Sequence, residues 1–444
     1  MRFTGVTRVG RRVGVVVCAA CAVATAIPAV AAASSTVWVS PNTVKGPFNS
    51  CATPGYNSIT EAAAVNPAKT TIHVCAGTYV EQARIEKPDT VEAEPGATLQ
   101  TPASPTKSGT PCDNATQQDL LTLCGAGKIK VSGLSFNGEW PTNSCGGDQI
   151  DLYVAGGSNL TLTGAKFLHA GPAALGEYGC GGGLAILVGH KSAGQTGRAN
   201  LSSDTIEGYE KNGITVDGSG SSAKISSVRI QGQPGVIVGQ NGIQISRGAT
   251  AKISGATIEG NECGNASCGP NTKGFAGPEA WEEAEDGTGI LFYEAAGGSS
   301  VKGSTINGND IGIYNLLNSA SANTTVQANA LNGNRYWGIA LDEGSAKVNN
   351  NVLSGPGKAG IQIVQYAIAE QFHEPSRGQA AGARGTGKAD TISGMSCALE
   401  GLSDNEPGDL PASLSITKSV SKFSGNTQEL CNNNTTGKLT ISVS

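Results

Sequence analysis

The chain has 444 residues and carries 30 basic and 35 acidic side chains, for a formal net charge of −5. This balance disfavours nucleic acid and anionic membrane surfaces as partners. Glycine accounts for 63 residues, about twice the usual ~7%, and aromatic residues for only 5%. Many tight corners and few large core side chains are therefore expected.

The first 33 residues have the order of a secretory signal peptide: basic, then apolar, then small residues. The segments are the arginines at positions 2, 8, 11 and 12, the apolar stretch 13–27 and the alanine-rich run 29–33. The apolar stretch is short for a membrane span, and no later segment offers about 20 uninterrupted apolar residues. We therefore expect a secreted, extracellular protein without a membrane span. A retained N-terminal anchor is the alternative, and Sec and twin-arginine export both stay open. Cleavage would leave 26 basic and 35 acidic residues, a net charge of −9.

Ten cysteines remain after the two in the signal segment, Cys18 and Cys21, are removed. They are Cys51, Cys75, Cys112, Cys124, Cys145, Cys180, Cys263, Cys268, Cys397 and Cys431. An even number in an exported chain favours five disulfides over free thiols or metal sites. The connectivity does not follow from the sequence, although pairing of neighbours is the most economical arrangement. No cysteine pair precedes a spaced histidine pair, so structural zinc is not expected.

Residues 34–110 contain four short phrases: WVSP at 38–41, SITEAAA at 58–64, TIHVCAGTYVEQ at 71–82 and EPGATL at 94–99. Together they resemble the entry module of pectin-lyase-like right-handed β-helix proteins. The resemblance implies a short helix that caps the first coil, followed by strands that lead into the helix proper. That superfamily holds polysaccharide lyases, glycoside hydrolases and pectin methylesterases. The paired-aspartate and Gly-His-Gly pattern of polygalacturonase-like hydrolases is missing, as are the methylesterase and pectate lyase signatures, so activity has to be argued from positions.

The central part, residues 111–364, repeats a phrase that begins with Gly-Ile. It occurs at Gly213, Gly242, Gly289, Gly312, Gly338 and Gly360, with spacings of 29, 47, 23, 26 and 22 residues. One coil per repeat fits these spacings if the long interval contains an insertion, placed at 262–286. Apolar residues alternate within each phrase, as Ile214 and Val216 do, which is typical of a strand with one buried face.

A second phrase keeps step with the first. Its apolar residues are Ile206, Ile230, Ile258, Ile306, Leu331 and Leu353. Because the two series lengthen at the same place, we predict an all-β right-handed parallel β-helix, a solenoid whose coils stack into one core. Hairpins at the Asn-Gly pairs are the alternative. Three residues after three of these positions stand Asn261, Asn309 and Asn334, which would form a stacked ladder or serve as ordinary turn residues.

The outer face of the Gly-Ile strands is the predicted site, because outward side chains of successive coils form columns about 4.8 Å apart. The proposed catalytic pair is Glu294, as general acid with a pKa raised beneath the insertion, and Asp342, more open to water, as base or nucleophile. Asp217, Arg247, Tyr293, Tyr314 and Trp281 are the proposed substrate contacts, since ring faces suit sugars. Asp151, Tyr153 and Gln362 are also expected to point outward. Polar residues that merely keep an exposed strand soluble are the alternative.

Two loops offer further chemistry. The acids of the 262–286 insertion could bind calcium, although no ligand spacing fixes a site and a solvated acidic loop is the alternative. No metal site or cofactor is otherwise expected. The last part, 365–444, combines a long loop, in which His373 lies beside Glu374, with C-terminal coils. His169 and His190 show no evident partners.

Two functions follow from these observations. The first is a secreted polysaccharide hydrolase or lyase that acts along the outer face of the β-helix. The second is a non-catalytic extracellular β-helix that binds glycans or a protein partner. The sequence does not indicate an oligomeric state.

Overall fold

The computed structural model describes residues 35–42, 50–107, 109, 111–113, 117–141, 147–172, 182–233, 236, 239–264, 286–316, 323–342, 344–365, 383–403, 411–432 and 439–444. The expected signal peptide, Trp281 and most of the 262–286 insertion lie outside these ranges, as do His373 and Glu374. Residues Ser35–Ser444 form one compact unit. None of the helices among the described residues is long and apolar enough to cross a membrane.

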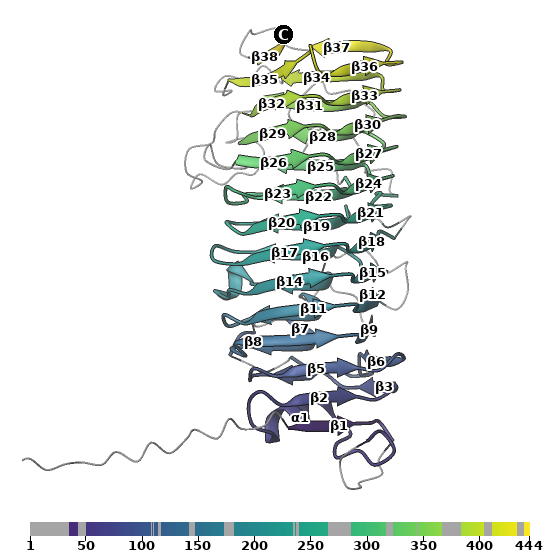
Figure 1. Ribbon diagram of the computed structural model, residues 1–444, viewed down its shortest axis with the longest axis vertical. Coiled ribbons are helices and arrows are strands. Elements are labelled where there is room, and N and C mark those ends of the chain that lie inside the picture. The colour runs from purple at the N-terminus through teal and green to yellow at the C-terminus, as the bar shows by residue number, and fades with distance from the viewer. Residues whose placement is uncertain are drawn as a thin grey trace, which may run out of the picture. The chain divides into compact units, whose positions relative to one another are not determined.

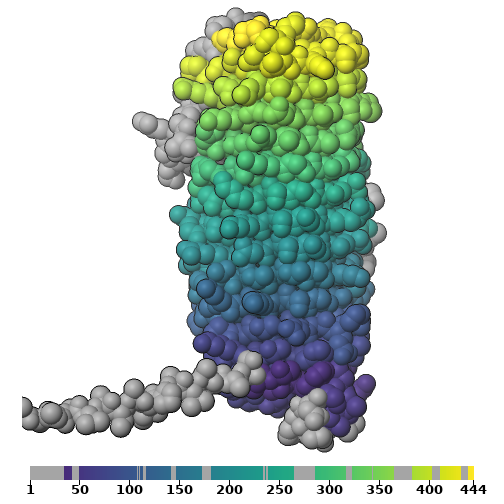
Figure 2. All heavy atoms as spheres, viewed as in Figure 1, coloured from purple at the N-terminus to yellow at the C-terminus, as the bar shows by residue number. Residues whose placement is uncertain are grey.

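Three parallel sheets make up this unit, and each coil of the chain contributes one strand to each sheet (Figure 1). The strand β16 is followed by β17 and β18, and the next coil places β19, β20 and β21 beside them. Every pairing is parallel and nearly free of register shifts, so the coils stack in chain order (Figure 2). The predicted parallel β-helix is confirmed.

Sheet 1 contains the Gly-Ile strands. Its members are β4 (Ala83–Ile85), β7 (Gln118–Cys124), β10 (Gln149–Ala155), β13 (Gly183–Val188), β16 (Asn212–Asp217), β19 (Asn241–Ser246), β22 (Thr288–Tyr293), β25 (Ile311–Leu316), β28 (Trp337–Leu341), β31 (Ala359–Gln365), β34 (Cys397–Ser403) and β37 (Gln428–Asn432).

Sheet 2 follows sheet 1 in each coil. Its members are β1 (Thr36–Val39), β2 (Thr71–Val74), β5 (Thr90–Ala93), β8 (Lys128–Ser132), β11 (Asn159–Thr163), β14 (Arg198–Ser202), β17 (Ser222–Ser226), β20 (Thr250–Ser254), β23 (Ser300–Lys302), β26 (Asn323–Gln327), β29 (Ser345–Asn349), β32 (Arg384–Lys388), β35 (Ala412–Thr417) and β38 (Leu439–Val443).

Sheet 3 holds the second phrase of the repeat. Its members are β3 (Gly77–Val80), β6 (Ala97–Gln100), β9 (Ser135–Trp140), β12 (Lys166–Pro172), β15 (Thr205–Glu207), β18 (Arg229–Gln231), β21 (Thr257–Glu259), β24 (Thr305–Asn307), β27 (Ala330–Asn332), β30 (Val352–Ser354), β33 (Thr391–Ser393) and β36 (Lys422–Ser424). A short 3-10 helix, Lys191–Ala193, lies between β13 and β14.

A short α-helix, α1 (Ile59–Val65), packs against the first coils, as the entry phrases predict. Ser58 caps its N-terminus by accepting from the Glu61 amide at 3.1 Å. The Glu81 carboxylate accepts from the Ile59 amide at 2.7 Å, which satisfies another amide of the first turn. The buried face of Ile59, Ala62 and Ala63 joins the core.

The core is built from columns of residues that occupy equivalent positions in successive coils. Ile214, Ile243, Ile290, Ile313 and Ile339 pair in consecutive strands of sheet 1, and all are almost fully buried. A side chain in such a column touches its equivalents above and below, so the core continues from coil to coil. Gly213 belongs to a neighbouring column where a Cβ would come within 2.7 Å of the Gly242 carbonyl oxygen. This close approach explains why the Gly-Ile phrase begins with glycine.

Side-chain ladders hold the corners between sheets. Asn309 Oδ1 accepts from the amide and side chain of Asn261 at 3.0 and 2.8 Å, and Asn334 Oδ1 accepts in the same way from Asn309. The predicted asparagine ladder is confirmed. A second ladder, between sheets 2 and 3, contains Asn329 and Asn351 and ends on the carboxylate of Asp390.

Disulfides join neighbouring cysteines in three described cases: Cys51–Cys75, Cys112–Cys124 and Cys397–Cys431. Cys263 is disulfide-bonded as well. Cys145, Cys180 and Cys268 lie outside the described residues.

The prediction that Asp151 points outward is wrong, and two other residues predicted to point outward, Tyr153 and Gln362, are buried. Asp151 points into the core, where a Cβ on Gly138 would overlap its carboxylate, so Gly138 leaves the room that it needs. Burial raises the pKa of Asp151 well above its usual value. Gln362 lies on the outer side but is only 1% exposed, because it packs in a polar cluster with Glu400.

Candidate functional site

The outer face of sheet 1 brings several predicted residues into one column. Asp217, Ser246, Tyr293 and Leu316 are register partners in successive coils. Asp342 directly follows Leu341, and its amide donates to the Asn315 carbonyl at 2.9 Å, which places it one coil beyond Leu316. Asp217 and Asp342 are thus four coils apart, about 19 Å at the usual strand spacing.

Asp217 and Arg247 form an ion pair at the end of this column. The Asp217 carboxylate accepts from Arg247 Nε at 2.6 Å, from Ser246 Oγ at 2.9 Å and from the Lys191 amide at 2.7 Å. Its side chain is fully buried, whereas 35% of the Arg247 side chain is exposed. Asp217 therefore positions the guanidinium, and Arg247 is the member that can meet a ligand.

His190, for which the sequence indicated no partner, lies beside this pair. His190 Nδ1 is 3.1 Å from Gln117 Oε1, and its Nε2 is 2.8 Å from Ser192 Oγ. Gln117 in turn donates to Asp119 at 2.8 Å. Since the Gln117 oxygen can only accept, Nδ1 carries the proton and Nε2 accepts from Ser192. The Asp148 carboxylate lies 3.7 Å from the same Nε2. We call Gln117, Asp119, Asp148, His190 and Ser192 the His190 cluster.

Burial shifts the protonation of this cluster toward its neutral forms. Burial lowers the pKa of His190, opposed by the charges of Asp148 and Asp217. Burial raises the pKa of Asp148, opposed by His190 and Arg247. The Asp148 side chain is nevertheless 35% exposed and the His190 side chain 6%. The carboxyl is therefore reachable from solvent while it lies next to a nearly buried imidazole.

A second cluster lies farther along sheet 1, and we call its members, Tyr314, Trp337, Asp342, Gln362 and Glu400, the Asp342 cluster. The Tyr314 hydroxyl donates to Asp342 Oδ2 at 3.0 Å. Glu400 Oε2 accepts from Trp337 Nε1 at 2.9 Å and from Gln362 at 3.0 Å. The Trp337 ring packs on the small side chains Ala340 and Ala359.

Tyr336 adds a partly exposed ring beside this cluster. The Arg335 guanidinium lies 4.7 Å from the ring centre and the Lys358 ammonium 5.6 Å. Rings of this kind offer apolar faces to sugars. Aromatic and acidic side chains therefore occur together at this end of sheet 1.

The exposures of the two proposed catalytic acids are the reverse of the expectation. Asp342, expected to be open to water, is 1% exposed, and Glu294, expected to be covered, is only half-buried. Glu294 has a φ of 51° and forms the corner that leads from sheet 1 into sheet 2. Tyr293 and Tyr314 are half-buried on the outer face. Glu294 follows β22 and Asp342 follows β28, so the two acids lie two coils apart.

Three side chains that can bind metals meet among the described residues: Cys51, Cys75 and Glu94. The two cysteines are joined in a disulfide, so their sulfurs are not thiolate ligands. The insertion acids proposed for calcium lie, except for Glu262 and Asp286, outside the described ranges.

Comparisons with known proteins agree with this architecture. A family model described as "Right handed beta helix region" matches residues 185–370. The catalytic domain of a GH87 α-1,3-glucanase in complex with nigerose superposes with a TM-score of 0.57 and 13% identity, over 92% of this chain and 68% of that chain. This chain has the right-handed parallel β-helix fold.

Two further structures resemble this β-helix. A variant of the same glucanase domain with tetrasaccharides gives a TM-score of 0.57 at 12% identity, over 92% of this chain and 68% of that chain. The A-module of mannuronan C-5 epimerase AlgE4 from Azotobacter vinelandii gives 0.47 at 11% identity, over 86% of this chain and 94% of that chain. No curated protein sequence matches this β-helix.

The His190 cluster could not be predicted from the sequence, for a physical reason. Gln117 and His190 are 73 residues apart, and they meet only because their coils stack. No short motif marks them, and Asp148 lies just outside a strand. Glu400 was missed as well, since it lies beyond the six Gly-Ile phrases, and only its register with Gln362 places it on the outer face.

Proposed function

We propose that this β-helix is a secreted enzyme that binds a polysaccharide along the outer face of sheet 1 and cleaves it beside the His190 cluster. The observation that favours this proposal is the Asp148–His190 pair, 3.7 Å apart, in which burial raises the pKa of the acid and lowers that of the imidazole. Groups whose pKa values are shifted in this way, next to each other on an accessible face, are typical of acid–base sites.

The pair supplies both halves of a proton transfer. Asp148, which holds its proton to higher pH than a free carboxyl group, donates it to the oxygen of the leaving sugar. His190, kept neutral, accepts a proton at Nε2 from the sugar carbon next to the leaving group, as in a lyase, because 3.7 Å is shorter than the 5 Å or more between the two catalytic groups of glycosidases. Gln117 and Asp119 hold the Nδ1 proton in place. Arg247, held by Asp217, faces the same region as a contact for hydroxyl or carboxylate groups.

The Asp342 cluster extends the binding surface along the axis. Tyr293, between the two clusters, and Tyr314, within the Asp342 cluster, are the proposed sugar contacts, and Trp281 remains a proposed contact from the insertion. Asp342 and Glu294 remain a second proposed position of bond cleavage, and Asp342 is about 19 Å from Asp217. The reported complexes of the glucanase catalytic domain with nigerose and with tetrasaccharides support a glycan as the ligand class.

Secretion is part of the proposal. The N-terminal pattern of basic, apolar and small residues and the three described disulfides support an oxidising, extracellular location.

The experiment is a polysaccharide panel with analysis of the products. Once a substrate is cleaved, we compare Asp148→Asn, His190→Gln, Asp342→Asn and Glu294→Gln, with Glu259→Gln on sheet 3 as control. Asp148→Asn and His190→Gln should each lower kcat at least ~100-fold, the usual scale of acid–base assistance, and the control should not. Full activity of both would refute the assignment to the His190 cluster.

A non-catalytic glycan-binding β-helix is the second candidate. The observation that favours it is the burial of Asp217 and Asp342, whose carboxylates are engaged by neighbouring side chains. Binding of a polysaccharide that is recovered intact, abolished by Tyr314→Ala, would favour this candidate over the enzyme.

A further inference from the structure

From β8 to β32, the outer side of sheet 2 carries charges of one sign only. Its outward positions from β8 to β32 hold nine basic residues, all exposed: Lys128, Lys130, Arg198, Lys224, Lys252, Lys302, Lys347, Arg384 and Lys388. We call them the basic face. The nine strands contain no aspartate or glutamate. This is unexpected in a chain with a net charge of −5.

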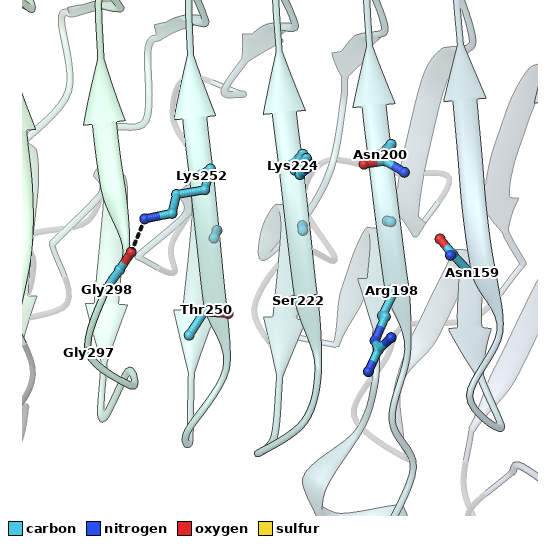
Figure 3. Close-up of a pocket in the computed structure, with 12 residues that line it drawn as sticks. Asn159, Arg198, Asn200, Ser222, Lys224, Thr250, Lys252, Gly297 and Gly298 are labelled. Carbon is cyan, nitrogen blue, oxygen red and sulfur yellow. Dashed lines mark hydrogen bonds between the residues drawn. The ribbon is translucent and has the colours of Figure 1, made fainter.

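In the described part of the chain, no ion pair within 4 Å joins the basic face to an acidic side chain. Lys224 and Lys252 are direct register partners, and the next position in that column is Asn200 (Figure 3). Like charges directly opposite each other on adjacent strands are destabilising, so the arrangement has a cost that a bound anion would offset.

A shallow depression lies on this face, with a volume of about 450 Å³. Its floor is formed by β14, β17 and β20, and the side chains around it include Arg198, Asn200, Ser222, Lys224, Thr250 and Lys252 (Figure 3). The depression is therefore lined by ammonium, guanidinium, hydroxyl and amide groups from successive coils. Hydroxyl-rich, negatively charged ligands match both kinds of group.

We propose that the basic face binds a linear anionic polysaccharide whose chain runs along the helix axis. Extended sugar chains place substituents at intervals close to the ~4.8 Å spacing of the coils. Single-stranded nucleic acid fits less well, because such binding uses aromatic stacking platforms and the outward positions of these nine strands hold no aromatic residue. A membrane surface fits less well, because the same positions hold no apolar side chain that could insert.

This site is separate from sheet 1 and does not depend on the proposed cleavage. Its role is attachment to an acidic matrix. Variants of the basic face should keep whatever polysaccharide-cleaving activity the protein has, so failure of one proposal leaves the other untouched.

The test compares charge variants in isothermal titration calorimetry at low ionic strength. The ligands are dextran sulfate, carboxymethyl dextran and neutral dextran, which share a backbone and differ in charge. The variant is Lys224→Gln/Lys252→Gln. The control, Lys166→Gln/Lys422→Gln, removes the same charge from exposed positions of sheet 3. Melting curves check that both remain folded.

We expect both charged dextrans to bind and neutral dextran not to bind. The sheet 2 variant should bind about 10-fold more weakly, with a smaller dependence of log Kd on log salt concentration, and the control should bind nearly as wild type. Stronger binding of one charged dextran identifies sulfate or carboxylate as the preferred group. Equal weakening by the control overturns the proposal. So does tighter binding of oligo(dT) or of phosphatidylglycerol vesicles than of either charged dextran.

Discussion

Buried carboxyl groups at the corners should make the stability of this β-helix depend on pH. Asp204 lies at the corner between sheets 2 and 3, is 1% exposed and accepts from the Ala165 amide at 2.9 Å. Burial raises the pKa of Asp204 to about 7. Asp390, at the equivalent corner of a later coil, has a pKa raised to about 6 by the same cause.

The sign of the resulting pH dependence follows from proton linkage. The folded state holds the Asp204 proton up to about pH 7, whereas the unfolded chain releases it near 3.8. The stability that this group contributes is therefore complete below about pH 4 and is lost as the pH rises toward 7, at about 1.4 kcal/mol per pH unit. Asp204→Asn keeps the shape and does not titrate, so the unfolding free energy should fall less over this range. Urea denaturation at pH 4, 5.5 and 7 checks this, and identical profiles for wild type and variant would contradict it.

The His190 cluster predicts the pH optimum of the proposed enzyme. Activity needs neutral His190 and protonated Asp148, and the fraction of this form is largest between the two pKa values. Because burial raises one pKa from 3.8 and lowers the other from 6.5, the optimum should lie in the acidic range. A pH profile of kcat/KM measures it. An optimum above pH 7 would exclude these two groups as the acid and the base.

Residue-level environments were the least predictable from sequence. Alternation placed Asp151 outward, yet Asp151 and the following Leu152 both face the core. Gln362 was assigned to the outer face correctly, but its burial depends on Glu400, 38 residues later. Contacts between coils determine how buried such residues are, and these contacts cannot be predicted from the sequence of a single strand.

At the scale of the strand, inward and outward positions alternate sharply. Leu353 is fully buried in the core, and the adjacent Val352 is 47% exposed on the outside of sheet 3. Leu353→Asp should unfold the protein at room temperature, because a charge would enter an apolar column. Val352→Asp should cost no more than about 1 kcal/mol. Thermal melts of the two variants measure the difference, and similar melting temperatures would refute the assigned facing.

Strands and coils were the most predictable features. The spacing of the Gly-Ile phrases and of the second phrase located sheets 1 and 3, because a repeated core position must recur once per coil. Sheet 2 was not recognised, although SAKIS and TAKIS at 222–226 and 250–254 repeat its pattern. Its inward residues are often alanine, which weakens the apolar signal, and lysine is uncommon in strands.

For the whole molecule, the cysteines give a direct check of the cross-linking pattern. Ten cysteines follow residue 33, and every described pair joins neighbours in sequence. Thiol titration of the oxidised protein under denaturing, non-reducing conditions should detect no free thiol. Two or more thiols per chain would show that five disulfides do not form.

The stacking of one coil on the next also sets a length scale for ligands. The basic face runs over nine consecutive strands of sheet 2, from β8 to β32, so its ends are eight strand spacings apart, about 38 Å. Chains shorter than this distance can engage only part of the nine charges, whereas longer chains gain no further contacts. The affinity of the basic face for the proposed anionic polysaccharide should therefore rise with the degree of polymerisation. It should level off once the polysaccharide is about as long as the basic face.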